Sequence, residues 1–233
     1  MKRELLYEGK AKRVYSTQDP LLLVIEFKDS LTAFDGKKRA ELKGKGVLNC
    51  KISSRLFKFL KDKEIENHFV KTLTEREMVV DRLDMIKIEA VVRNWAAGHI
   101  LKRLGIEQGE KFKSPILEFY YKRDDLGDPM INLSHIRELE LATYEEMDRI
   151  SELSLRVNQE LSGFFRDRGI RLIDFKLEFG RKEGKILLGD EISPDTCRLW
   201  DMETGKVLDK DRFRRDMGEV LEAYKEIWER IRE

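Results

Sequence analysis

Cysteine, proline, histidine and long apolar runs are all scarce in this sequence. Its 233 residues include two cysteines, four prolines and three histidines. Cys50 and Cys197 lie far apart, and no two histidines have the spacing of metal ligands, so neither a disulfide scaffold nor a zinc site is indicated. The longest apolar run, residues 21–25, is too short to cross a membrane, and no secretory signal opens the chain. We therefore expect a soluble, cytoplasmic protein.

No excess of charge of one sign is present either. Lysine and arginine total 46 against 45 aspartates and glutamates. A dedicated nucleic-acid binder usually carries a marked basic excess, so we expect no nucleic-acid partner. Charged residues are nonetheless 39% of the chain, with only five Asn and three Gln, which is typical of a thermophile surface rich in ion pairs.

The first part of the chain is predicted to be mostly β-structure. Short β-prone runs occupy residues 5–7, 13–16 and 21–27, separated by turn signals at Gly9 and Pro20. A helix is expected after residues 44–46, because apolar residues then recur at helical spacing. Strands return at 69–72, 78–81 and 85–92. We take residues 1–84 as a β-rich unit.

The remainder, residues 85–233, mixes strands and helices. A short helix is predicted over 96–104, a strand over 115–121 and a hairpin over 170–192. Thr143 and Glu146 form a capping box that opens a long amphipathic helix ending before Gly169. A single amphipathic helix from about Phe213 to Ile231 closes the chain. The pattern predicts an α+β fold with a smaller, β-rich N-terminal lobe and a larger mixed C-terminal lobe.

One strand of the hairpin carries ionisable side chains on one face. Alternation places Asp174, Lys176 and Glu178 together, opposite an apolar face that includes Ile173 and Phe175. A three-residue loop at 183–185 would put Glu178 directly opposite Asp190. Two facing carboxylates favour a Mg²⁺ site, while the alternative is a solvated charged face.

Three further clusters combine cations with tight turns. Gly9, Lys10 and Lys12 form a turn that suits a phosphate, or else a solvated hairpin. Arg93 ends a strand before a helix start, where it would bind an anion beside helix N–H groups or pair with a nearby Glu. Arg198 follows the turn at 193–195, where it would bind a phosphate or a local Asp.

These clusters together resemble the SAICAR synthetase family of purine biosynthesis. The blocks that carry the resemblance lie in the family's order at residues 9–12, 91–98, 174–180 and 189–195. The blocks Asp-Phe-Lys-Leu-Glu-Phe-Gly and Asp-Glu-Ile-Ser-Pro-Asp are highly specific. The resemblance implies a two-lobed ligase with ATP in the cleft. Such a ligase joins carboxyaminoimidazole ribonucleotide to L-aspartate and forms ADP and phosphate.

The resemblance also implies roles for individual residues. ATP would contact the turn and the lobe junction through Gly9, Lys10, Ala11, Lys12, Val14, Met85 and Lys122. Glu178 and Asp190 would hold Mg²⁺ beside the nucleotide. The ribonucleotide would contact Glu89, Arg93, His99, Asp174, Lys176, Ser193 and Arg198. Of these, Arg93, Asp174 and Lys176 are the expected catalytic residues.

One position departs from the family pattern, because His99 stands where the family usually has Ser. A histidine can donate a hydrogen bond to phosphate and add charge, but it is larger than a serine. Two other functions stay open on the sequence: an ATP-dependent phosphotransferase acting on a small anion, and a nucleotide-sensing protein without catalysis. The oligomeric state is also open, a homo-oligomer included.

Overall fold

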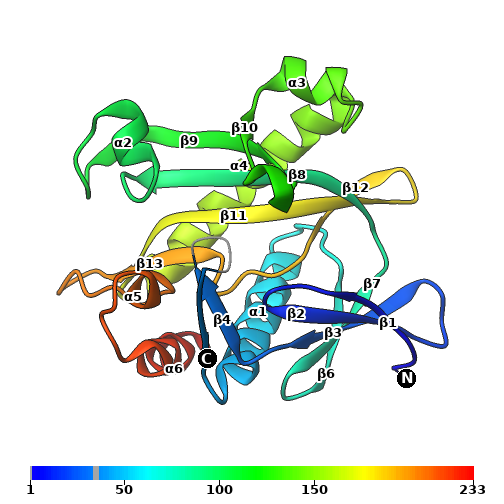
Figure 1. Cartoon of the computed structure of the whole chain (residues 1–233), viewed down its shortest axis with the longest axis horizontal. Helices are drawn as coiled ribbons and strands as arrows, with labels where there is room; N and C mark the ends of the chain where they lie inside the picture. The colour runs from blue at the N-terminus through cyan, green and yellow to red at the C-terminus, as the bar shows by residue number, and fades with distance from the viewer. Residues whose placement is uncertain (1, 34–36) are drawn as a thin grey trace.

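A computed structural model describes residues 2–33 and 37–233 of the chain (Figure 1). A five-stranded antiparallel sheet is built from the N-terminal region, in the order β1-β2-β3-β7-β6. Its strands are β1 (Leu5–Glu8), β2 (Lys12–Ser16), β3 (Leu22–Phe27), β6 (Phe69–Thr74) and β7 (Glu77–Asp81). Beside it, β4 (Ser30–Ala33) pairs with β5 (Lys38–Glu41), a hairpin that the sequence analysis missed.

A second antiparallel sheet follows, in the order β10-β9-β8-β11-β12, with β13 also paired to β11. Its strands are β8 (Asp84–Trp95), β9 (Lys111–Tyr121), β10 (Met130–Ile131), β11 (Ile170–Lys182), β12 (Lys185–Gly189) and β13 (Cys197–Asp201). Strand β11 is central, because it pairs with β8, β12 and β13. The chain passes from the first sheet to the second between β7 and β8, near the residue 84 at which the boundary is expected. The division into two domains stays a prediction.

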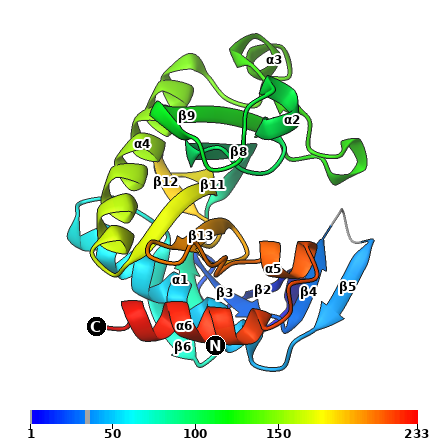
Figure 2. The same ribbon diagram turned by 90° about the vertical axis from the view of Figure 1, so that its left-hand side faces the viewer.

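Of the three longest helices, two pack on these sheets and the third packs on one of those helices, as Figures 1 and 2 show. The three are α1 (Lys45–Asp62), α4 (Tyr144–Arg166) and α6 (Val220–Ile231), and the short elements are α2 (Ile100–Leu104), a 3₁₀ turn (Asp124–Leu126), α3 (Leu133–Glu138) and α5 (Asp211–Arg214). The capping box of Thr143 and Glu146 is confirmed. Within the described residues, no helix is long and apolar enough to cross a membrane.

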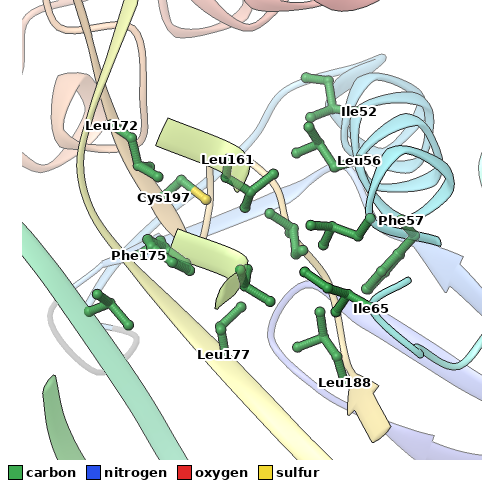
Figure 3. Packing of buried hydrophobic residues seen from close by; sticks show 14 of the residues in the cluster. Ile52, Leu56, Phe57, Ile65, Leu161, Leu172, Phe175, Leu177, Leu188 and Cys197 are labelled. Atoms are coloured by element: carbon green, nitrogen blue, oxygen red, sulfur yellow. The ribbon is translucent and has the colours of Figure 1, made fainter. Parts of the chain in front are cut away.

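One apolar core joins both sheets. Ile52, Leu56 and Phe57 from α1 face Phe175 and Leu177 from β11 (Figure 3). The C-terminal helix α6 lies beside α1 rather than on the second sheet (Figure 2). The first and last parts of the chain are therefore packed together.

Several local predictions are wrong. The single helix expected over 213–231 is divided into α5 and α6, because residues 216, 218 and 219 all have positive φ. The helix expected over 96–104 begins only at Ile100, because residues 96–99 are irregular and Gly98 among them has a φ of 71°. Ile173 does not share the face of Phe175: the pairing of β11 with β13 shifts between Leu172 and Asp174, and Ile173 packs in a separate cluster with Ala97 and Trp200.

Candidate active site

The charged face of β11 is confirmed, and the neighbouring strand supplies partners for it. Lys176 Nζ lies 2.7 Å from Glu89 Oε2 on β8. Burial acts to lower the pKa of Lys176, but the ion pair with Glu89 outweighs this effect and raises the pKa. Asp174 accepts from Arg93 Nη1 at 2.7 Å across the same two strands. Four of the predicted site residues are thus brought together by the pairing of β8 with β11.

The predicted register between Glu178 and Asp190 is off by one residue. Glu178 lies opposite Gly189, because Glu183 and Gly184 make a two-residue turn with φ values of 51° and 76°. Two positive φ values define a type I′ turn, which is one residue shorter than the loop expected. Asp190 follows the strand directly, with a φ of 58°.

The two carboxylates nevertheless interact. Burial and the charge of Asp190 raise the pKa of Glu178 to about 6. Burial acts to raise the pKa of Asp190 as well, but attraction from Lys12 and Lys122 lowers it to about 2. Two buried carboxylates with pKa values driven apart are typical of functional sites.

Two lysines from distant segments reach this pair. Lys12 on β2 forms ion pairs with Asp190 and, at 3.0 Å, with Glu191. Lys122, just after β9, lies 2.5 Å from Glu178 Oε2. The carboxylates therefore form a mixed cluster with the ammonium groups, rather than a bare pair.

Lys10 is not part of that cluster. It is exposed at the turn between β1 and β2, and its nearest carboxylate is Asp124, at 3.0 Å. Gly9 donates its N–H to the Lys12 carbonyl at 2.9 Å, which closes the turn. The Ala11 carbonyl accepts from Lys28 N, while Val14 packs on the core. A cavity of about 350 Å³ borders this turn.

Met85 lies where β8 enters the second sheet, and it is 39% exposed. A side chain at Gly189 would approach Met85 Cε to 3.3 Å, and one at Gly180 would approach Met85 Sδ to 3.2 Å. The lack of a side chain at Gly180 and Gly189 therefore leaves room for Met85. Because Gly189 directly precedes Asp190, Met85 lies close to the carboxylate pair.

The pair of Glu178 and Asp190 could hold a divalent cation only together with oxygen atoms supplied by a ligand. Within the parts of the chain that the structure describes, no group of three or more His, Cys, Asp or Glu could enclose a metal. Mg²⁺, however, is often held by one or two carboxylates plus the oxygens of substrate phosphates. Glu178 and Asp190 suit that arrangement: burial and the charge of Asp190 both raise the pKa of Glu178, and an added cation would offset both effects.

Arg93 and Arg198 share Asp174 at the far end of the charged face. Arg93 Nε binds Glu118 at 2.8 Å, and Arg198 binds Asp174 and Asp211, each at 2.8 Å. The expectation that Arg93 lies beside helix N–H groups is wrong, because α2 starts seven residues later and Arg93 points a donor at the Ala97 carbonyl. The alternative, an ion pair with a nearby Glu, is confirmed.

The segment before α2 lies against Arg198. A Cβ at Gly98 would fall 2.6 Å from Arg198 Nη2, and Gly98 has a φ of 71°. Only glycine combines this backbone conformation with so close an approach. The exposed His99 is the next residue in the chain, and its role in binding a phosphate stays a prediction.

The turn at residues 193–196 is buried and rigidly held. Ser193 Oγ donates to Glu191 at 2.6 Å. Asp195 binds Lys45 Nζ at 2.5 Å, Asn49 Nδ2 at 2.9 Å and Tyr224 OH at 2.7 Å. Sequence reasoning missed these partners, together with Glu118, Glu191 and Asp211. Lys45 is fully buried, but its position in the sequence, between Gly44 and Gly46, does not indicate this.

A second cavity, of about 520 Å³, lies away from these residues. Ion-paired side chains such as Lys182 with Asp81 and Lys185 with Glu66 line it. Such surface pairs contribute little to ligand binding, and none of the predicted site residues lines this cavity.

Five cations from five segments lie around three buried carboxylates, those of Asp174, Glu178 and Asp190. The cations are Lys12, Arg93, Lys122, Lys176 and Arg198. An α+β chain with this concentration of Lys and Arg is typical of enzymes that act on phosphorylated, anionic substrates. A family model described as SAICAR synthetase matches residues 5–231. The chain belongs to the SAICAR synthetase family.

Individual relatives are similar over their whole length. The phosphoribosylaminoimidazole-succinocarboxamide synthase of Caldanaerobacter subterraneus subsp. tengcongensis is 55% identical over 232 residues, which cover 100% of this chain and 99% of the relative. The crystal structure of that enzyme from Ehrlichia chaffeensis has a TM-score of 0.96 at 49% identity and covers 98% of each chain. A SAICAR synthetase in complex with ADP has a TM-score of 0.95 at 49% identity, covering 98% of this chain and 97% of the other.

Proposed function

We propose that this chain joins carboxyaminoimidazole ribonucleotide to L-aspartate, with conversion of ATP to ADP and phosphate. The observation that carries the proposal is the 55% identity to a phosphoribosylaminoimidazole-succinocarboxamide synthase across the full chain. The charge pattern supports it, because both the nucleotide and the ribonucleotide bring phosphates, and both acceptor substrates bring carboxylates. Cations and carboxylates gathered on one strand suit such a set of ligands.

The nucleotide is assigned to the junction of the two sheets, as the cleft between two lobes. There the turn of Gly9, Lys10 and Lys12 would hold phosphates, Met85 the adenine, and Lys122 would lie near both. Support comes from the ion pairs of Lys12 and Lys122 with the carboxylate pair. Mg²⁺ held by Glu178 and Asp190 would neutralise charge on the transferred phosphoryl group.

The ribonucleotide is assigned to the other end of the charged face. Arg198, Arg93 and His99 would bind its phosphate, while Asp174, Lys176, Glu89 and Ser193 would surround the ribose and the imidazole carboxylate. The shared position of both arginines on Asp174 supports this, because it fixes two guanidinium groups side by side. Lys176, held by Glu89, would then orient the carboxylate that accepts the amine.

We predict that ADP forms at full rate only when both the ribonucleotide and L-aspartate are present. The amine of aspartate must displace an oxygen of the activated carboxylate, so turnover stops without it. The measurement is ADP release in a coupled assay with each substrate omitted in turn. Full-rate ADP release without aspartate would favour the phosphotransferase, and ATP binding without any turnover would favour a sensor protein.

We predict that His99→Ser retains substantial activity and flattens the pH dependence of ribonucleotide binding between about pH 5.5 and 7.5, where imidazoles change charge. The reason is the position of residue 99, next to the glycine that contacts Arg198. Isothermal titration of the ribonucleotide across this range is the measurement, with His135→Ser on α3 as a control. A profile identical to that of the unmodified protein would show that His99 does not contact the phosphate.

A further inference from the structure

Lys210 is attached to the same buried turn as Lys176, but the mechanism above gives it no role. Its backbone N–H donates to the Pro194 carbonyl at 3.2 Å, just before α5. The N–H of Lys176 donates to the Thr196 carbonyl at 3.0 Å. The two lysines therefore sit on either side of one short turn, close to the site assigned to the imidazole carboxylate.

The ammonium of Lys210 differs from the other lysines of the site in having no partner. Lys12, Lys122 and Lys176 each form an ion pair with a carboxylate. In residues 2–33 and 37–233, the half-buried Lys210 side chain makes neither a hydrogen bond nor an ion pair. It is thus a cation of the site whose donors are still available.

The carboxylate that attracts Lys210 is already engaged by other donors. Asp195 attracts Lys210, but its oxygens already accept from Lys45, Asn49 and Tyr224. Burial lowers the pKa of Lys210, and repulsion from Arg214, Lys45 and Lys176 adds to the effect. An unpaired ammonium in such a place destabilises the ligand-free protein, and an anionic ligand would remove this cost.

L-aspartate is the one substrate whose anionic groups have no cation assigned to them above. The phosphates of ATP and of the ribonucleotide, and the imidazole carboxylate, have residues assigned to them above. L-aspartate carries two further carboxylates, and its amine must reach the carboxylate oriented by Lys176. We propose that Lys210 binds a carboxylate of L-aspartate, which holds the amine near the carboxylate that it attacks. This inference rests on the proposed function.

The test is Lys210→Met, which keeps most of the length of the unbranched side chain and removes its charge. We expect the KM for L-aspartate to rise about 10- to 150-fold, the range for loss of one charged hydrogen bond. The KM values for ATP and the ribonucleotide should change less than twofold. Lys225→Met, on the exposed side of α6, is the matched control and should change none of the three. Lys210→Arg should recover part of the aspartate affinity.

Thermal melting separates binding from folding. Because Lys210 lacks a partner, Lys210→Met should melt at the same temperature as the unmodified protein or slightly above it. An unchanged KM for aspartate overturns the inference, and so does an equal rise in all three KM values with a lower melting temperature, which would indicate a structural role. If the unmodified protein forms ADP without aspartate, the proposed function itself fails, and that result needs no variant.

Discussion

Glu178→Gln should lower turnover at least 100-fold and remove most of the thermal stabilisation that Mg-ATP gives. Ligand stabilisation follows affinity for the folded state, and this variant loses one of two carboxylates available to the cation. Without ligand, the melting temperature should be equal or higher. Burial and Asp190 raise the pKa of Glu178 to about 6 from 4.5, so its charged form destabilises the fold by on the order of 2 kcal/mol at neutral pH. Melting curves with and without Mg-ATP, together with turnover, are the measurements.

Asp190→Asn provides the contrasting control. Lys12 pairs with Asp190 and helps to lower its pKa, so this variant should lose both the Mg-ATP shift and some ligand-free stability. The two variants should therefore differ in ligand-free stability, because the pKa values of the two carboxyls are shifted in opposite directions. Normal turnover and an unchanged Mg-ATP shift in both variants would show that these carboxylates bind no metal.

The pH dependence of the unmodified protein tests the same residue. A carboxyl whose folded pKa exceeds its unfolded value gains protons in the folded state, so the stability it contributes is present at low pH and is lost as the pH rises through about 6. Protonated Glu178 is a poor metal ligand. Mg-ATP binding should therefore weaken as the pH falls from about 7 toward 5.5.

Arg93→Met should be the most destabilising single change at the site, by about 3–5 kcal/mol. Arg93 is buried between Glu118 and Asp174, and its loss leaves both carboxylates short of a counter-charge. The melting temperature should fall by on the order of 10 °C for a chain of this size. Chemical denaturation and thermal melting of the ligand-free protein measure the effect.

Arg103→Met is a matched control, because Arg103 binds the same Glu118 from the exposed helix α2. Its loss should change stability by less than about 1 kcal/mol. Adding Glu118→Gln to Arg93→Met should restore part of the loss, since it removes one unpaired carboxylate. Equal effects of the two arginine variants would contradict the role given to burial.

The sequence correctly predicts those features that depend on neighbouring residues of the chain. The helix opened by Thr143 was correct because its capping box and apolar stripe lie within one segment. The common face of Asp174, Lys176 and Glu178 was also correct, because strand alternation is local. The bulge near Ile173 and the turn at Glu183 escaped prediction, since pairing with other strands and turn type decide them.

The contacts of the site depend on topology instead. Lys12 meets Asp190 across 178 positions of the chain, and Arg93 meets Asp174 across 81. No spacing rule connects such residues; the order of strands in two sheets does. The resemblance to a known family named most of these positions in advance, but not the partners Glu118, Asp211 and Tyr224 that hold them.

The bond from Tyr224 to Asp195 links helix α6 to the turn between the two proposed substrate sites. Helix α6 also packs on α1, which supplies Lys45 and Asn49 to the same carboxylate. Local unfolding of α6 would therefore remove the hydroxyl from Asp195 and expose the matching face of α1 in one step. Substrates that bind beside the folded turn should accordingly slow hydrogen exchange at the backbone amides of α6, a helix that lies outside both proposed sites.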